Sequence, residues 1–151
     1  MIAKNVMTRD VIAVKPEDSI EKAARLLIEN KISGIPVVDD DNCVLGIITE
    51  RDLIIKAADL KVPFYITLFD SIIFLENPIR FNKELKKYSA SLVKDAMTYN
   101  VVVIEEEKPV SEVVEIMKRK NINRVPVVKN NKLVGIVTRN DILKSLVKSD
   151  G

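Results

Sequence analysis

The residues best suited to chemistry in this chain are two threonine–aspartate pairs of identical spacing. Thr49 precedes Asp52, and Thr138 precedes Asp141, in each case by three residues. An ionised carboxylate only accepts hydrogen bonds, and it can accept from two neighbouring hydroxyls, such as the vicinal pair of a ribose. A threonine hydroxyl can donate to a phosphate, and the free amides at a helix start favour an anion. The pairs therefore indicate a site for a sugar phosphate.

The same spacing also has a purely structural interpretation. Thr-x-x-acid where a helix begins is a capping box, in which the threonine accepts from the third helical amide and the acid accepts from the threonine amide. Such a cap is worth only about 1 kcal/mol, and glutamate would serve at least as well as aspartate. Both interpretations stay open at this point.

Catalytic chemistry has no support in the rest of the chain. There is no histidine, and the single cysteine is Cys43, which excludes His-based triads, His-based metal sites and an intramolecular disulfide. No other residues suggest an activated nucleophile or a metal cluster. We therefore expect no enzyme activity, no catalytic residues, no metal site and no catalytic cofactor.

The bulk properties describe a soluble chain with a core. Its 151 residues are 47% hydrophobic and 30% charged, and the net charge is +2, so the basic face that a dedicated nucleic-acid partner requires is not expected. The N-terminus does not resemble a signal peptide. The most apolar stretch, residues 62–75, is shorter than the roughly 20 residues that cross a bilayer. We expect no transmembrane segment and a cytoplasmic location.

An internal repeat positions these residues. The second copy of each segment lies 90 residues after the first for the first two segments, and 89 residues after it for the third, which places one deletion in the turn between them. A doubled unit usually buries the apolar faces of its two copies against each other. The matching segments are Met7-Thr8 with Met97-Thr98, Ile35–Val38 with Val125–Val128, and Gly46–Leu53 with Gly135–Ile142.

Each copy is predicted to run strand, helix, strand, turn, strand, helix. The first helices should begin with Asp18 as N-cap and with Pro109 in the first turn. Each carries an apolar stripe at the i, i+3, i+4, i+7 spacing of a core-facing helix. The stripes are Ile20, Ala23, Ala24 and Leu27, and Val110, Val113, Val114 and Met117; the first strands are Val11–Val14 and Val101–Ile104, and the last helices are Leu53–Leu60 and Ile142–Val147.

The two central strands of each copy should form a hairpin. The turns are Asp39–Asn42 and Asn130-Asn131, since asparagine tolerates the positive φ of a two-residue turn. Gly46 and Gly135 lie within the following strands, where glycine is unfavourable unless something approaches the backbone closely. Either tight packing or a ligand accounts for them equally well.

These motifs, in order and in both copies, resemble the CBS domain, named after cystathionine β-synthase. Its signature is a Pro-Val-Val strand, a turn, and a Gly-x-x-Thr-x-x-Asp strand that opens a helix, here over about residues 1–60 and 92–148. The resemblance implies an α+β fold of two βαββα units packed with pseudo-twofold symmetry, called a Bateman module. It also implies two clefts for AMP, ADP, ATP or S-adenosylmethionine.

By the same resemblance, each cleft combines the Thr and Asp of one copy with the first strand, and the residues before Pro-Val-Val, of the other copy. The apolar members would flank an adenine ring, and Arg124 is either a phosphate ligand or a solvated surface side chain. One cleft would contain Thr138, Asp141, Val11, Ala13, Ile32, Ser33 and Gly34; the other would contain Thr49, Asp52, Val101, Val103, Ile122, Asn123 and Arg124.

The region between the copies departs from the family. We expect CBS domains at 1–60 and 92–151 and a helical connector at 61–91, in which Phe64, Leu68, Ile72 and Leu75 would line one helix face. A helix this apolar must be buried or partnered. It would pack on its own module or across a homodimer, dock to a membrane protein, or lie at a membrane surface.

The sequence therefore predicts a regulatory protein that binds an adenine nucleotide or S-adenosylmethionine, forms a homodimer, and regulates an unidentified transporter or enzyme. Two alternatives remain: a dimerising scaffold that binds no ligand, and a nucleic-acid-binding module, for which the near-neutral charge gives little support.

Overall fold

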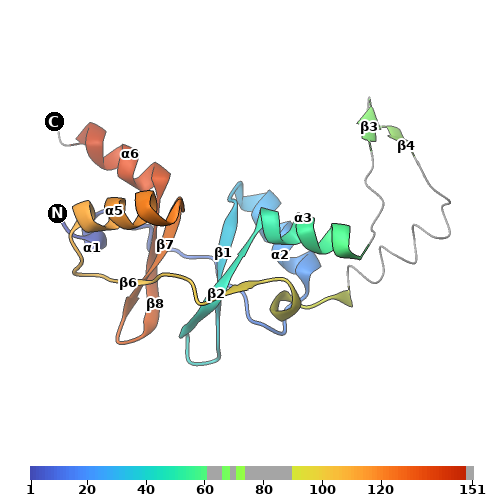
Figure 1. The fold of residues 1–151 in the computed structure, drawn as a ribbon, viewed down its shortest axis with the longest axis horizontal. Coiled ribbons are helices and arrows are strands. Elements are labelled where there is room, and N and C mark those ends of the chain that lie inside the picture. Colours follow the sequence, from blue (N-terminus) through green and yellow to red (C-terminus); the bar gives the residue numbers. More distant parts are fainter. Residues whose placement is uncertain (61–65, 69–70, 74–89, 149–151) are drawn as a thin grey trace. The chain divides into compact units, whose positions relative to one another are not determined.

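The computed structural model describes residues 1–60, 66–68, 71–73 and 90–148. The order helix, strand, strand, helix occurs twice along the chain, as the repeat predicts (Figure 1). In chain order the elements are α1 (Ala3–Val6), α2 (Ile20–Asn30), β1 (Gly34–Val38), β2 (Val44–Thr49), α3 (Glu50–Asp59), β3 (Ile66–Leu68), β4 (Ser71–Ile73), the 3-10 helix η1 (Val93–Asp95), β5 (Thr98–Tyr99), β6 (Ile104–Glu105), α5 (Val110–Lys120), β7 (Arg124–Lys129), β8 (Lys132–Thr138) and α6 (Arg139–Lys148).

The described strands form two three-stranded sheets, with the orders β1-β2-β5 and β6-β7-β8, and the separate pair β3-β4. The chain divides into two compact units. Unit 1 contains Met1–Ala13, Pro36–Ile47 and Tyr99–Gly151, and unit 2 contains Val14–Ile35 and Ile48–Thr98. The units follow the packing of the chain, whereas the domains predicted at 1–60 and 92–151 follow its repeat.

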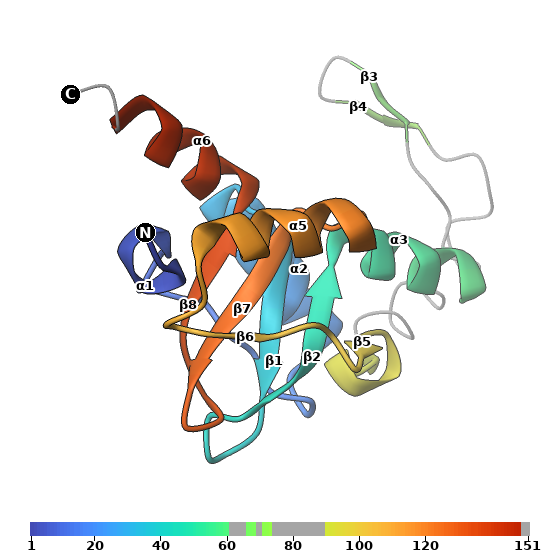
Figure 2. The same ribbon diagram turned by 60° about the vertical axis from the view of Figure 1, so that its left-hand side comes forward.

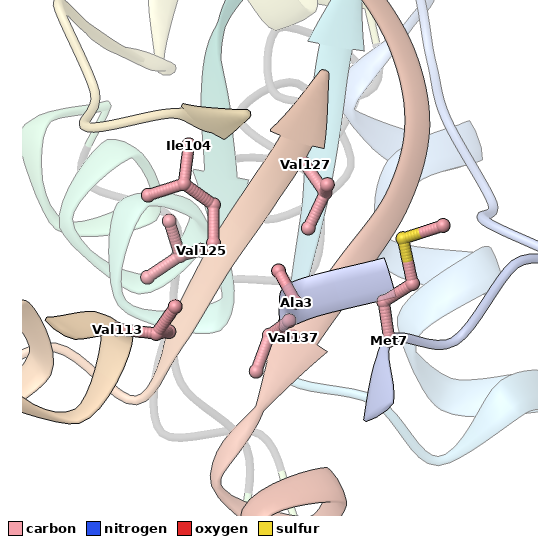
Figure 3. Packing of buried hydrophobic residues seen from close by; sticks show 7 residues of the cluster. All are labelled: Ala3, Met7, Ile104, Val113, Val125, Val127 and Val137. Atoms are coloured by element: carbon pink, nitrogen blue, oxygen red, sulfur yellow. The ribbon is translucent and has the colours of Figure 1, made fainter. Parts of the chain in front are cut away.

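Unit 1 has its core on the sheet β6-β7-β8. Strand β7 pairs antiparallel with β8 and parallel with β6. Helix α5 packs on β7, and the short α1 contacts α5, α6 and β8 (Figures 1 and 2). One cluster of buried hydrophobic side chains comes from α1 and the residue that follows it, from α5 and from the three strands (Figure 3). Its members are Ala3, Met7, Ile104, Val113, Val125, Val127 and Val137.

The β7–β8 hairpin confirms the predicted two-residue turn. Asn130 and Asn131 have φ angles of 52° and 66°, the left-handed values that a tight hairpin turn requires and that asparagine tolerates. The turn between β1 and β2 also lies where predicted, and its Asn42 has a φ of 65°. The asparagines in both turns therefore suit the left-handed backbone that these hairpins contain.

Gly135 lies in β8 because another segment of the chain packs on its backbone. A side chain built there would overlap Met7 Sδ and would meet the Thr8 carbonyl oxygen at 3.0 Å. The amides and carbonyls of Thr8 and Ile136 exchange hydrogen bonds of 2.8 and 2.9 Å across this contact. Of the two explanations open for Gly135, tight packing is the one that the structure supports.

In unit 2, helix α2 packs against α3. Its buried residues Ile20, Ala23 and Leu27 belong to the predicted stripe. The segment from Ser91 to Val93, which leads into the second copy, is hydrogen-bonded to the start of α2. Val93 N donates to Asp18 O, and Ile20 N donates to Ser91 O. Val93 is fully buried there, so this segment is part of the core of unit 2.

Several local predictions are wrong by one or a few residues. The N-cap of α2 is Ser19, whose Oγ accepts from Lys22 N, and Pro109 is the N-cap of α5 and lies before its first turn. Val114 is 39% exposed, because the buried face of α5 is centred on Val113 and the half-buried Ile116 and Met117 pack beside it. A rotation of one residue is enough to move a position off the apolar face of a helix.

The predicted first strands are also largely wrong. In Val11–Val14 only Val14 forms a bridge, and β6 begins at Ile104, so Val101 to Val103 form no ladder. Their β-branched side chains favour extended backbone, but a strand also needs a partner for its amides and carbonyls. β6 pairs with β7 only through Ile104 and Glu105.

Most of the predicted helical connector lies outside the described residues. The part that is described, Ile66–Leu68 and Ser71–Ile73, forms an antiparallel pair in which Ile66 lies opposite Ile73. These six residues are therefore extended, which suits their isoleucine and threonine content. For the rest of 61–89 the helical insertion stays a prediction.

Candidate functional site

Both threonine–aspartate pairs lie where a strand turns directly into a helix. Thr49 is the last residue of β2 and the N-cap of α3, with extended backbone at φ −117° and ψ 165°. Thr138 is the last residue of β8, and α6 begins at the next residue. No loop separates strand from helix in either copy, so the sheet holds the first helical turn in place.

In the second copy, the Asp141 carboxylate is buried, with 8% of its surface exposed. Its Oδ2 accepts from Thr138 N at 2.9 Å and from Thr138 Oγ1 at 3.0 Å, while Asp141 N donates back to Thr138 Oγ1 at 3.2 Å. The capping box expected as the structural interpretation is therefore present.

The first copy repeats this geometry. Asp52 Oδ2 accepts from Thr49 N at 2.9 Å and from Thr49 Oγ1 at 3.0 Å, and Asp52 N donates to Thr49 Oγ1 at 3.2 Å. Asp52 is half-buried, so the two sites differ in solvation although their hydrogen bonds match. The positive end of each helix dipole stabilises the carboxylate.

A second threonine contacts each carboxylate, and it is not among the site residues predicted from the sequence. Thr8 Oγ1 donates to Asp141 Oδ1 at 2.9 Å, and Thr98 Oγ1 donates to Asp52 Oδ1 at 3.1 Å. Each of these threonines belongs to the Met-Thr dipeptide of the opposite copy. The sequence signal that points to them is the recurrence of Met-Thr, which places a threonine at the same position in both copies.

These bonds leave each carboxylate with limited capacity. A carboxylate has about four acceptor positions, and in each copy two on Oδ2 and one on Oδ1 are filled. One position on Oδ1 remains for a ligand hydroxyl. The capping threonine already donates its own proton to the carboxylate, so a bond from that hydroxyl to a phosphate would require it to rotate.

The residues before each Pro-Val-Val strand lie beside the strand–helix junction of their own copy. Glu50 N donates to Ser33 O at 3.0 Å, and Arg139 N donates to Asn123 O at 2.9 Å. Arg124 is the cross-strand partner of Thr138. The family resemblance places Arg124 and Thr138 in different clefts, whereas the hairpin makes them neighbours on one sheet.

The remaining candidates fall into the two units as follows. Asp141 shares unit 1 with Val11 and Ala13, the first-strand residues assigned to its cleft. Val103 and Ile32, proposed to contact an adenine ring, are 40% and 37% exposed, which leaves apolar surface available to a ligand. The other candidates in unit 1 are Val101, Ile122, Asn123, Arg124 and Thr138, and those in unit 2 are Ser33, Gly34, Thr49 and Asp52. The combination of these residues into two clefts stays a prediction.

The described part of the chain contains neither a candidate metal centre nor a candidate membrane span. No group of three or more cysteine and acidic side chains there is placed to hold a metal ion. No helix in the same ranges has the length and apolarity needed to cross a bilayer.

Comparison with known proteins gives consistent matches over nearly the whole chain. The family model described as CBS domain matches residues 3–59 and 93–148. The uncharacterized protein MJ1426 of Methanocaldococcus jannaschii is 30% identical over 155 residues, which span 97% of this chain and 92% of that protein.

Two solved structures have the same fold. The CBS-domain containing protein ATU1752 from Agrobacterium tumefaciens is 30% identical, with a TM-score of 0.71 over 97% of this chain and 99% of that one. The CBS domain pair of protein MJ0100, in complex with 5′-methylthioadenosine and S-adenosyl-L-methionine, is 27% identical, with a TM-score of 0.69 over 99% of this chain and 98% of that one.

Proposed function

Since the chain belongs to the CBS domain family and is a tandem CBS pair, or Bateman module, of α+β fold, we propose that it binds an adenosine-containing ligand as a regulatory signal. The candidate ligands are AMP, ADP, ATP and S-adenosylmethionine. The chain itself catalyses no reaction in this proposal, and ligand occupancy acts on a partner transporter or enzyme.

One observation carries this proposal: each copy holds a carboxylate at a helix start with one acceptor position still available. The carboxylates of Asp52 and Asp141 each accept three hydrogen bonds, so each has one acceptor position left. A hydrogen bond to a charged acceptor is roughly twice as strong as a neutral one. A ribose hydroxyl is the chemical partner that this position suits.

The identity of the ligand is inferred from a relative and from the surrounding side chains. The CBS pair of MJ0100 is in complex with two adenosine derivatives, 5′-methylthioadenosine and S-adenosyl-L-methionine. In this chain, exposed Val103 and Ile32 offer apolar surface for a purine ring. Arg124 is the cross-strand neighbour of Thr138 and provides a planar charged fork suited to phosphate.

The test is equilibrium dialysis against AMP, ADP, ATP, S-adenosylmethionine and RNA, with wild type, Asp52→Ala, Asp141→Ala and the double variant. Loss of a charge-assisted hydrogen bond should weaken adenosine-ligand binding about ten- to a hundred-fold at the altered site. Asp18→Ala is the matched control, since Asp18 also accepts a backbone amide near a helix start, at 2.8 Å from Lys15 N. It should leave affinity unchanged.

The outcomes separate the alternatives. If the double aspartate variant keeps its affinity for the ligand but melts at a lower temperature, the Thr-x-x-Asp pairs are helix caps only. They would then not be part of the ligand site. Wild-type protein that retains none of the small molecules would indicate a ligand-free scaffold. Retention of RNA alone would favour the nucleic-acid module instead.

A further inference from the structure

We propose that a cluster of basic side chains in unit 1 binds single-stranded nucleic acid through its phosphate groups. This cluster, the basic corner, consists of Lys118, Arg119, Lys120, Arg124 and Arg139. The inference goes beyond the proposed adenosine-ligand function and does not depend on it.

The charge of the chain is distributed unevenly along the sequence. Residues 116–148 contain nine lysines and arginines and a single acidic residue, Asp141. This segment therefore has a net charge of +8 in a chain whose net charge is +2. The near-neutral total, which gave little support for a nucleic-acid partner, conceals a strongly basic segment of the kind that phosphate binding requires.

Three backbone segments of unit 1 meet at the basic corner. Lys118 to Lys120 form the last turn of α5. Arg139 N, at the first residue of α6, donates to Asn123 O at 2.9 Å, and the next residue, Arg124, begins β7. Arg124 is also the cross-strand partner of Thr138, the residue before α6. The five cations therefore belong to the junction where α5 ends and where β7 and α6 begin (Figure 1).

The basic corner is open to solvent and is not neutralised by neighbouring acids. Its lysines and arginines are exposed, except Arg124, which is half-buried. None of the four exposed cations forms an ion pair with another described residue. The Asp141 carboxylate at this junction already accepts three hydrogen bonds from threonines. The four exposed cations are therefore available to an external anion.

The requirements of the fold account for only part of this cluster. Cations in the last turn of a helix are favourable for its dipole, so Lys118 to Lys120 also stabilise α5. Arg139 is the first residue of α6, where a cation opposes the dipole. Its side chain forms no hydrogen bond or ion pair with the rest of the described chain. Helix stability therefore does not explain Arg139, whereas an anionic partner does.

The first copy provides an internal comparison, because it has the same junction without the cations. Glu50 N donates to Ser33 O at 3.0 Å, the same bond that is made at the start of α6. Two flanking positions are basic, Lys31 and Arg51, so the junction of the first copy has two charges of each sign. The residues equivalent to the basic corner are Ile28, Glu29, Asn30, Gly34 and Glu50. The backbone of this junction therefore does not need the five cations.

The neutral residues of the junction favour nucleic acid over a lipid surface. Asn121, Asn123 and Asn140 are exposed and lie beside the cations in the sequence. An asparagine side chain both donates and accepts hydrogen bonds, as the base edges and sugars of a single strand require. A membrane surface is instead matched by cations combined with apolar side chains. A flexible single strand can also bring successive phosphates to cations that are irregularly placed.

The experiment measures the fluorescence anisotropy of short single-stranded RNA, oligo-U and oligo-A, at a series of salt concentrations. The test variant is Arg119→Glu/Arg139→Glu, which installs the glutamates of the first copy. The matched control is Lys22→Glu/Arg25→Glu on α2, which changes the net charge equally and installs the glutamates that α5 has at the equivalent positions. Thermal melting of each protein monitors folding, and Arg119→Gln/Arg139→Gln replaces the test variant if that protein does not fold.

We expect wild type to bind both oligonucleotides with similar affinity, because phosphate contacts carry no sequence information. The logarithm of the association constant should fall with the logarithm of the salt concentration, by about 0.7 for each phosphate contacted. The Arg119→Glu/Arg139→Glu variant should bind roughly ten-fold more weakly at low salt and should have a slope smaller by about 1.4, as for two lost contacts. The control variant should keep the wild-type affinity and slope.

Four results would overturn the inference. An equal loss of affinity in the control variant would show that total charge, and not the basic corner, governs binding. RNA binding that does not weaken with salt would exclude phosphate contacts. Wild type that binds neither oligonucleotide at low salt would remove nucleic acid as a partner. Wild type that co-sediments with phosphatidylglycerol vesicles but binds no RNA would assign the basic corner to a lipid surface instead.

Discussion

At the scale of single residues, the two aspartates make the same set of hydrogen bonds in different surroundings. Both accept from two threonines and one amide, but Asp141 is buried and Asp52 is half-buried. The energetic cost of removing a carboxylate depends on what it leaves unpaired and whether water can reach those groups. Removal of the aspartate can therefore cost a different amount of stability in each copy, although the two copies share a sequence pattern.

The first prediction compares these two aspartates. Asp141→Ala should lower the free energy of unfolding by about 2–3 kcal/mol, because the Thr138 amide and the Thr8 hydroxyl lose a buried partner. Asp52→Ala should cost about 1 kcal/mol, as for a cap that water replaces. Urea unfolding of both variants measures the difference, and a larger loss for Asp52→Ala would contradict the argument.

The second prediction concerns acid stability and Asp18. Burial by itself would raise the pKa of the Asp18 carboxyl, but the Lys15 amide bond and the nearby Lys22 and Lys15 charges outweigh it, so the pKa lies below its ordinary value. Lys22 Nζ lies 3.2 Å from Asp18 Oδ1. A carboxylate with a lowered folded pKa contributes stability above its unfolded pKa and loses it as the pH falls through the folded pKa.

Asp18→Asn should therefore reduce stability at neutral pH and flatten the decline in stability below about pH 4. Melting temperatures of wild type and variant between neutral pH and pH 2 test this. Parallel curves for the two proteins over that range would show that Asp18 does not contribute to the acid transition.

At the scale of elements, the strands and helices follow local patterns, whereas their contacts depend on distant segments. Helix α1 is only four residues long and is too short to be stable alone. It is held because Ala3 N donates to Lys108 O and Val110 N donates to Met1 O. Ala3 and Met7 then complete the core on β7 and β8 (Figure 3).

The third prediction tests this contact at Gly135. Gly135→Ala should destabilise unit 1 by about 1–3 kcal/mol, because the added methyl group overlaps Met7 and presses on the Thr8 carbonyl. Met7→Ala alone should also destabilise, since it leaves a cavity. In the double variant the methyl group occupies part of that cavity. The double variant should therefore lose less stability than the sum of the losses in the two single variants. Strictly additive losses in urea unfolding would contradict the packing explanation.

At the scale of the whole molecule, apolar side chains remain exposed on the last helix of each copy. On α6, Leu143 and Val147 are 54% and 75% exposed, and on α3 the residue equivalent to Leu143, Ile54, is 58% exposed. Residues four apart lie on one helix face, so Leu143 and Val147 form a continuous apolar strip. Strips of this kind in soluble proteins commonly mark an interface.

The fourth prediction is that the protein self-associates through this strip. Wild type should sediment as a dimer, and Leu143→Glu/Val147→Glu should give a monomer with little change in the unfolding of the subunit. Val114→Glu is the control, since Val114 is an exposed apolar residue on α5 and should leave the dimer intact. A monomeric wild type, or a dimer that survives the double substitution, would show that this strip is not the interface.

The sequence by itself determined the repeat, the order of helices and hairpins, the family resemblance and the two capping boxes. The turns and the capping boxes depend on interactions within a few residues. The Thr138–Asp141 box spans three residues, and each turn depends on its own asparagines. Local chemistry of this kind can be recognised in a sequence because the interacting residues are adjacent in it.

Only the tertiary structure decided which residues contact the carboxylates and why Gly135 is a glycine. Thr8 and Asp141 are 133 residues apart, and Thr98 and Asp52 are 46 apart. The sequence contained the Met-Thr repeat, but no local pattern relates it to an aspartate in the other copy. That relation arises because the first segment of each copy packs with the last strand and helix of the other, where burial of Met7 on Gly135 brings the Thr8 hydroxyl to Asp141.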